Sequence, residues 1–249
     1  MTRTEIISEL ENLNLSKESI FYYRDNNYFG YEYDDRYKRC IIGGGFGFNN
    51  DPNSKTIPLI NLNIYYLHLH ELLNPLHSDN SHSDMRPYQH NILFNKTLGE
   101  KTYSNFPLTI NSKKDLRKLK SLLEQFWKND AVPFFQYWSD LRSLLPFIET
   151  SVPSELAEIL SHRLIEKKMI IWKLCSHPQY DFFIQERKEI LEKAMRRNPQ
   201  KKNLSEMYSA IEVMEDRLIN VEPLYVWDDS LLIPKPYKGI MPKTISNSI

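Results

Sequence analysis

The sequence has little cysteine and no long apolar run. Its two cysteines, Cys40 and Cys175, lie far apart without paired spacing, which excludes a disulfide framework and a four-thiolate zinc site. We therefore expect two buried free thiols. No apolar run approaches the ~18 residues of a membrane-spanning helix, and the first residues lack the apolar centre of a signal peptide. These absences predict a cytoplasmic protein with no membrane partner.

The chain also lacks net charge, because 32 Lys and Arg residues balance 32 Asp and Glu residues. No global field draws such a chain onto nucleic acid or an anionic membrane, so nucleic acid is the less favoured partner and any binding to it must be local. Apolar residues make up 41% and charged residues 26% of the 249 positions. This balance is typical of a folded globular protein with a sizeable core.

The first part of the chain has the texture of an antiparallel sheet. Aromatic and β-branched runs are separated by turns of two or three residues, which are too short for a parallel crossover. A short helix is predicted over 3–12, followed by strands at 20–24, 28–33, 37–42 and 60–66. In the last of these, Ile60, Leu62, Ile64 and Tyr66 share one face, so we expect that face to be buried.

Helical periodicity dominates from residue 111 onward. Ser112 can cap a helix in which Leu116, Leu119, Leu123 and Phe126 share a face. Further helices are predicted near 134–145, 154–175, 179–196 and 204–219. The tail from Val221 contains Pro223, Pro234, Pro236 and Pro242, so we expect it to pack as an extended strap.

A sheet followed by helices is the pattern of a segregated α+β fold: an N-terminal antiparallel meander with a C-terminal set of helices packed on it. We predict a mainly β portion over 1–110 and a helical portion over 111–220, continuous with it in one domain. Residues 221–249 form the extended, proline-rich tail.

Four of the seven glycines fall in the run from Gly43 to Gly47. A phosphate-binding loop needs a helix directly after its glycines, whereas this chain continues with Asn49-Asn50-Asp51-Pro52, a turn. We expect instead a strand whose missing side chains let an element rich in Phe or Tyr lie close against the sheet.

Five of the seven histidines lie between His68 and His90. His77, Asp79 and His82 are the candidate metal ligands, and a metal-dependent hydrolase using this region is the alternative functional hypothesis. A zincin helix starting at His70 would need a second histidine where Asn74 stands. An ordinary exposed loop has the same Ser-, Asn- and His-rich composition and is the default interpretation, so no cofactor is predicted.

Two charged patterns have ordinary explanations. Glu166-Lys167-Lys168 and Glu186-Arg187-Lys188 match the carboxylate-x-lysine spacing of metal-dependent nucleases, but both fall in predicted helices, where a solvated face explains them. A basic cluster follows, for which a nucleic-acid-associated adaptor is the third hypothesis and the helix macrodipole the structural alternative. The cluster comprises Lys193, Arg196, Arg197, Lys201 and Lys202.

Aromatic residues are dense around the first predicted helical hairpin. We expect them to form core, and any that are exposed to be natural hot spots for a partner. They are Phe126, Trp127, Phe134, Phe135, Tyr137, Trp138 and Phe147.

The order of these segments resembles a group of uncharacterised bacterial α+β domains over roughly residues 18–145. The resemblance rests on the meander, on the strand at 60–66, on Phe106-Pro107-Leu108-Thr109-Ile110 leading into the helix from Ser112, and on Val132-Pro133-Phe134-Phe135 leading into Tyr137-Trp138-Ser139-Asp140-Leu141. Some members are encoded beside toxin genes and are regarded as immunity proteins. The resemblance carries over no functional residue.

No complete catalytic motif is present in the sequence. A non-enzymatic, protein-binding protein is therefore the first hypothesis, most concretely an immunity or inhibitor-like protein that neutralises a partner toxin by covering its active site.

Overall fold

The chain forms two compact units in the computed structural model. The first contains residues 1–67, 86–139 and 236–249, and the second contains residues 68–85 and 140–235. The predicted division between residues 110 and 111 lies inside the first unit. The structure describes residues 1–17, 19–24, 28–34, 38–47, 54–57, 60–73, 92–94, 108–150, 160 and 163–237.

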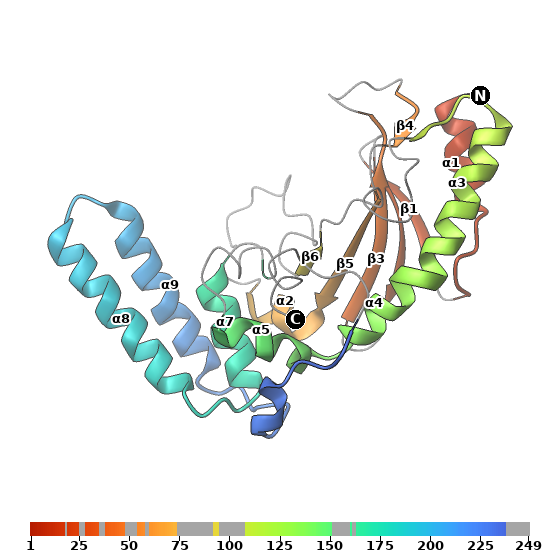
Figure 1. The fold of residues 1–249 in the computed structure, drawn as a ribbon. Helices are drawn as coiled ribbons and strands as arrows, with labels where there is room; N and C mark the ends of the chain where they lie inside the picture. The colour runs from red at the N-terminus through yellow and green to blue at the C-terminus, as the bar shows by residue number, and fades with distance from the viewer. Residues whose placement is uncertain are drawn as a thin grey trace. The chain divides into compact units, whose positions relative to one another are not determined.

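An antiparallel five-stranded sheet with the strand order β1-β2-β3-β5-β6 organises the first unit (Figure 1). Its strands are β1 (Ile20–Arg24), β2 (Tyr28–Asp34), β3 (Lys38–Gly45), β5 (Ile60–Tyr66) and β6 (Ile92–Phe94). A separate antiparallel pair joins β4 (Thr56–Ile57) to β7 (Leu108–Thr109). The predicted meander is therefore confirmed, since β1, β2 and β3 are neighbours in both sequence and space.

One face of this sheet is the core of the first unit. Ile60, Leu62, Ile64 and Tyr66 of β5 are all buried, as their alternation predicts. Cys40 pairs with Ile64 across β3 and β5 and is buried without a disulfide bond, as expected. The hydroxyl of Tyr66 donates a hydrogen bond to the Trp138 carbonyl at 2.8 Å, so the polar end of this ring is satisfied inside the core.

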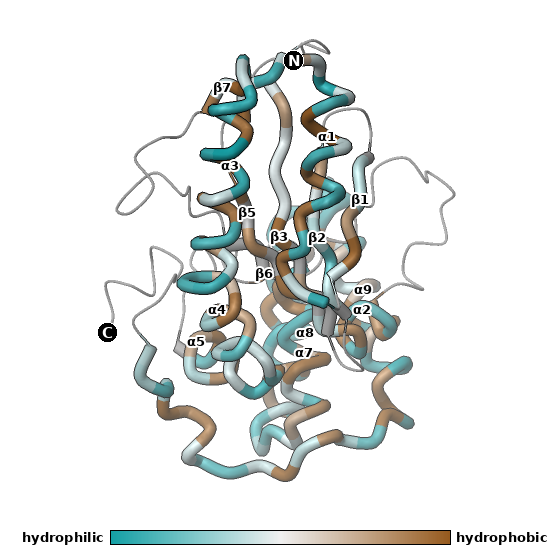
Figure 2. The backbone as a smooth tube through the Cα atoms, turned by 90° about the vertical axis from the view of Figure 1, so that its right-hand side faces the viewer, coloured by the Kyte–Doolittle hydropathy of each residue, from teal (hydrophilic) through white to brown (hydrophobic). Residues whose placement is uncertain are grey.

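Two amphipathic helices belong to the same unit, α1 (Arg3–Glu11) and α3 (Lys113–Phe126), and hydrophobic and hydrophilic residues alternate along both (Figure 2). Ser112 caps α3 in a reciprocal capping box with Asp115. The helix buries Leu116, Leu119, Leu123 and Phe126, as predicted. The Tyr31 hydroxyl of β2 donates to the Leu10 carbonyl of α1 at 2.7 Å, which ties this helix to the sheet.

Helix α3 continues through a π-helical segment (Trp127–Ala131) into α4 (Val132–Tyr137). The Val132 N–H bonds the Trp127 carbonyl, five residues back rather than four. Pro133 accounts for this change, because it has no N–H to offer and its ring crowds the carbonyl four residues earlier. The buried face is shifted by one residue as a result, since Phe126 is followed by Ala131, Phe134 and Trp138.

The glycine run forms the end of β3, and aromatic rings of the adjoining strand lie against it. A Cβ atom on Gly43 would overlap the Tyr28 ring, and one on Gly44 would come within 2.8 Å of both Phe29 and Ile60. Gly30 of β2 has the same relation to Tyr22 of β1, whose Cζ would lie 2.5 Å from an added Cβ. The expectation of a glycine strand beneath an aromatic element is confirmed.

Replacement of Gly43 by Ala tests this packing. Alanine suits a strand better than glycine, so without the Tyr28 contact the change would stabilise the protein by roughly 0.5–1 kcal/mol. The overlap with Tyr28 makes it destabilising instead, by about 1–2 kcal/mol in chemical denaturation. In a Tyr28→Ala background the sign should reverse. An equal cost of Gly43→Ala in both backgrounds would contradict the contact.

The second unit is helical. It contains all of α2 (Leu67–Leu73) except the first residue, followed by a 3-10 turn (Leu141–Leu144) and α5 (Leu145–Thr150). Its longer helices are α7 (Leu164–Leu174), α8 (Tyr180–Arg197) and α9 (Lys202–Leu218), of which α8 and α9 form an antiparallel hairpin (Figure 1). The order of a sheet followed by helices confirms the α+β class. In the described part of the chain no helix has the length and apolarity needed to cross a membrane.

Helix α7 is the centre of the second unit and contacts both α8 and α9. Met169, Ile170 and Ile171 are consecutive and fully buried, so this helix is buried on several sides rather than along one stripe. Beyond α9 the chain runs as an extended strap, defined here as residues 219–233, with one 3-10 turn at Asp229–Leu232. An extended segment after Val221 is the structure that its prolines predict.

Candidate partner-binding surface

The strap is fixed to the end of α7 by its backbone. The Leu174 carbonyl accepts hydrogen bonds from the N–H groups of Leu224, at 2.9 Å, and Tyr225, at 3.0 Å. Carbonyls in the last turn of a helix have no partner within it, and the strap supplies one here. Ser176, whose left-handed φ of 52° ends the helical path, adds a bond from its Oγ to the Tyr225 carbonyl at 2.8 Å.

A second anchor holds the side chain of Tyr225. The guanidinium carbon of Arg142 lies 4.4 Å from the centre of the Tyr225 ring, a cation–π distance. Arg142 is itself held by the Asp140 carboxylate, whose Oδ2 accepts from Nη2 at 2.5 Å and from Nε at 3.0 Å. Burial raises the pKa of Asp140, but the hydrogen bonds and charge of Arg142 outweigh burial and lower it overall. Asp140 is therefore ionised at neutral pH, and the ion pair is complete.

An aromatic stack forms the third anchor. The His177 ring lies parallel to Trp172, with ring centres 3.7 Å apart, and Trp227 of the strap meets His177 edge-on at 4.3 Å. The Gln179 N–H donates to Nδ1 of His177 at 3.1 Å, so in the neutral ring the proton sits on Nε2. That nitrogen lies 2.9 Å from Glu149 Oε1.

Burial dominates the electrostatics around this stack. It lowers the pKa of His177 to about 4, with help from the Lys168 charge, and raises the pKa of Glu149 against the opposing effect of Lys168. Lys168 is held by the Ile148 carbonyl at 3.0 Å and by the Trp172 ring at 4.3 Å. At neutral pH His177 is thus an uncharged packing partner of the strap.

The Cys175 thiol beside this cluster is buried, and burial raises its pKa to about 12. It therefore stays protonated at neutral pH, which is unsuited to nucleophilic chemistry. The backbone bonds to Leu174, the Arg142 contact and the aromatic stack together hold the strap in place.

The outward side of the strap is apolar. It carries five of the ten large apolar side chains that are exposed in the described part of the chain, and Val226 is 87% and Ile233 70% exposed. The others are Ile219, Leu224 and Leu232. Three exposed acidic residues accompany them, Glu222, Asp228 and Asp229, whereas no Lys, Arg or Gly occurs between residues 218 and 234. The strap therefore presents a rigid apolar edge with negative charge around it.

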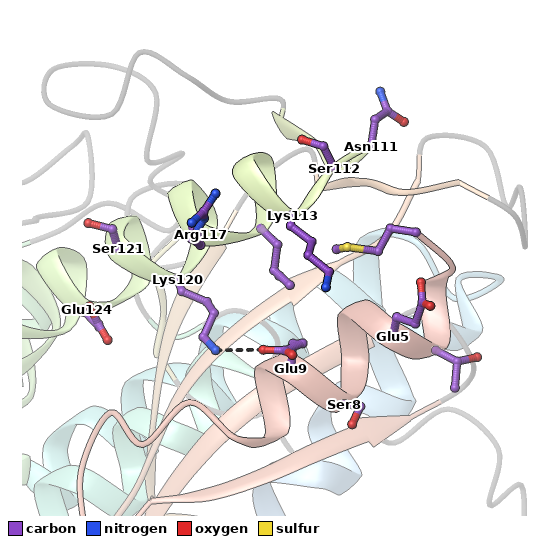
Figure 3. A pocket seen from close by; sticks show the side chains of 13 residues that line it. Glu5, Ser8, Glu9, Asn111, Ser112, Lys113, Arg117, Lys120, Ser121 and Glu124 are labelled. Atoms are coloured by element: carbon purple, nitrogen blue, oxygen red, sulfur yellow. Dashed lines mark hydrogen bonds and ion pairs between the residues drawn. The ribbon is translucent and has the colours of Figure 1, made fainter.

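The described residues of the first unit line a larger and a smaller hollow. The larger, of about 910 Å³, is an open groove between α1 and α3 (Figure 3). Its α1 wall carries Glu5 and Glu9 and its α3 wall carries Lys113, Arg117 and Lys120, with Lys120 paired to Glu9 at 3.1 Å. The two walls largely neutralise each other, and the groove has no aromatic lining, so it has little to offer as the apolar centre of an interface.

The smaller hollow, of about 340 Å³, has aromatic walls from Tyr33, Trp127 and Phe135. Trp127 and Phe135 meet edge-on at 6.1 Å. Most of the aromatic residues expected in the core are indeed buried, while Trp127 and Tyr137 are half-buried. Trp127 is the member of this group that meets solvent beside a cavity.

The predicted metal ligands His77, Asp79 and His82 lie outside the described residues. Of the other histidines of that region, the structure places His68 and His70 on α2, where His68 Nδ1 lies 3.8 Å from the Glu71 carboxylate. Within the described ranges, no three His, Cys, Asp or Glu side chains converge on a point where a metal ion would sit.

One of the two carboxylate-x-lysine patterns was misinterpreted. Both lie on helices as predicted, but Lys167 is fully buried and donates to the Leu160 carbonyl, so Glu166-Lys167-Lys168 is no solvated face. Burial lowers the pKa of Lys167 to about 7. The consecutive apolar residues from Met169 to Trp172 are the signal that this helix is central. In the second pattern, Lys188 pairs with Glu215 across α8 and α9.

Comparison with known proteins gives no relative: no family model matches the chain, no curated protein matches it in sequence, and no solved structure matches its fold. The resemblance to bacterial immunity-type domains stays a prediction.

The pH dependence of stability tests the His177 anchor. The unfolded chain takes up a proton on this residue near pH 6.5, whereas the folded protein does so only near pH 4. The unfolded state thus binds more protons between these values, so stability falls as pH decreases through this range. After allowance for solvent screening, we expect a loss of about 1 kcal/mol at pH 5.

His177→Gln should flatten this acid limb in thermal unfolding scans from pH 7.5 to 4. The opposing titration of Glu149 is present in both proteins, so the comparison isolates His177. Superimposable profiles would contradict a neutral, buried imidazole.

Proposed function

We propose that this chain is a non-enzymatic, protein-binding protein of the inhibitor type, and that its most concrete form is a cytoplasmic immunity protein that neutralises a toxin. The observation that carries the proposal is the strap, an extended segment whose backbone is fixed at Leu174 and whose apolar side chains face solvent.

Rigidity is what makes such a segment effective. Association costs free energy for every loop and side chain that it orders, and a segment already held in one conformation avoids most of that cost. Pro223 in the strap and Pro234 directly after it restrict the backbone further. The turn of the strap is capped by Asp228, whose carboxylate accepts the Ser230 N–H at 2.8 Å. The strap is therefore ordered before any partner arrives.

The exposed side chains supply the attraction. Burying a side chain such as Val226 or Ile233 contributes roughly 1.5–3 kcal/mol. Glu222, Asp228 and Asp229 favour a partner with a basic surface, because complementary charge steers encounter and suppresses wrong partners. A toxin whose active site is basic and partly apolar fits this description.

A pull-down from lysate of the native cells, followed by titration of the purified partner, tests the proposal. We expect one stoichiometric protein partner for the wild-type chain and a loss of affinity of at least 100-fold, or roughly 3 kcal/mol, for the double variant V226D/I233D. Phe182→Asp on α8 is the matched control, because Phe182 is also exposed and apolar but lies outside the strap.

Equal binding by V226D/I233D and F182D would show that the strap is not part of the interface. Recovery of no partner, together with a stoichiometric metal ion in the purified protein, would favour the hydrolase alternative built on the His68–His90 region.

A further inference from the structure

The far end of the α8–α9 hairpin carries an excess of positive charge. Residues 193–205, called here the basic tip, contain five cations and no acidic residue. The last turn of α8 and the first turn of α9 meet there, joined by the loop from Asn198 to Lys201. We propose that the basic tip binds the phosphate backbone of duplex nucleic acid, a function separate from that of the strap.

Neighbouring carboxylates neutralise little of this charge. Lys193 lies 3.7 Å from Glu189 and Arg196 lies 3.6 Å from Glu192, and both cations are well exposed, at 68% and 80%. Exposed pairs of this length contribute little. Arg197, Lys201 and Lys202 have no ion-pair partner among the residues that the structure describes.

Helix stability explains only part of the cluster. Lys193, Arg196 and Arg197 lie near the C-terminus of α8, where the macrodipole favours cations. Lys201 and Lys202 stand at the N-cap and first position of α9, where the macrodipole disfavours them and a Ser or Asp would cap the helix. No side chain caps this terminus. Two of the five cations therefore destabilise the helix they begin, so helix stability does not explain their position.

The shape and composition of the tip select the kind of nucleic acid. Two helices side by side are about 20 Å wide, which exceeds the ~12 Å major groove, so the tip meets the backbone rather than the base edges. Residues 193–205 contain no aromatic side chain on which an unpaired base could stack. Asn198, Gln200 and Asn203 add hydrogen-bonding groups of the kind that contact phosphates. The proposal is therefore duplex binding without sequence preference.

The contact is confined to the tip. On α9 the exposed Glu206 lies one helical turn beyond Lys202 and offsets part of its charge. The acidic residues Glu212, Glu215 and Asp216 lie ten or more residues along α9 from Lys202, about 15 Å at helical rise, which is beyond the ~8 Å Debye length at physiological salt. They leave the tip's field intact but would repel a duplex laid along the hairpin. At most five phosphates can be neutralised.

Fluorescence anisotropy with a labelled 20-base-pair DNA duplex, at 50 to 200 mM NaCl, tests the proposal on the full chain. Five contacts predict a slope of log affinity against log salt near −4.5, or about a 500-fold loss over this range. R197Q/K201Q/K202Q should reduce the slope to about −1.8. The matched control K114Q/R117Q/K118Q removes one Arg and two Lys from exposed positions on α3 and should leave the wild-type slope unchanged.

Lys201→Asp gives a second, independent readout. It installs an N-cap and so should raise the melting temperature while weakening duplex binding, an outcome that loss of folding cannot imitate. No binding at 50 mM NaCl, equal effects of the tip and control triple variants, or tighter binding of single-stranded DNA would each overturn the proposal. Equal competition by poly-L-glutamate would also overturn it and assign the tip to acidic protein surfaces.

Discussion

A helix that ends inside a protein leaves carbonyl groups that must find hydrogen-bond partners, and the end of α7 imposes this constraint on the second unit. The Leu174 carbonyl is satisfied by two N–H groups of the strap, and Ser176 turns the chain away in a left-handed conformation. The position of Tyr225 against Arg142, and of Trp227 against His177, follows from this docking. Without those two backbone bonds, the apolar side chains of the strap would have no fixed direction.

The neutral net charge of the chain conceals a strong segregation of charge. The strap is acidic and apolar, with no cation between residues 218 and 234, whereas residues 193–205 are basic with no acid. Both segments flank the same helix, α9, which therefore joins a positive end to a negative one. A neutral total excludes a global field, as composition predicts, yet it says nothing about local fields of several residues. Two surfaces with opposite chemistry can coexist on one unit for this reason.

The fold could be predicted from sequence where a short local pattern of residues is compatible with only one structure. Ser112 followed by Asp115 and four spaced apolar residues defines α3, and the glycines from Gly43 onward define a strand under close contact. Both are local patterns, so their meaning does not depend on distant residues.

The surfaces proposed for binding could not be predicted in this way, because exposure is a tertiary property. Val226 and Ile233 look like any apolar residues until the Leu174 contact determines which side of the strap meets solvent. The prediction for Lys167 was wrong for the same reason. A lysine in a helix suggests a solvated face, and only the tertiary structure shows that Lys167 is buried and donates to the Leu160 carbonyl. The basic cluster could be recognised in the sequence. Its division between the end of α8 and the start of α9 could be assigned only once the bounds of these helices were known.

The π-helical segment at Trp127–Ala131 holds one residue more than an α-helical path of the same length. The core positions before and after it, Phe126 and Phe134, are out of step by that single residue. A helix with such a turn can absorb an insertion or deletion of one codon without rotating the rest of its buried face away from the sheet. Length changes at this place in the gene are thus the ones that natural variation could accumulate in the helix at the least cost to the core.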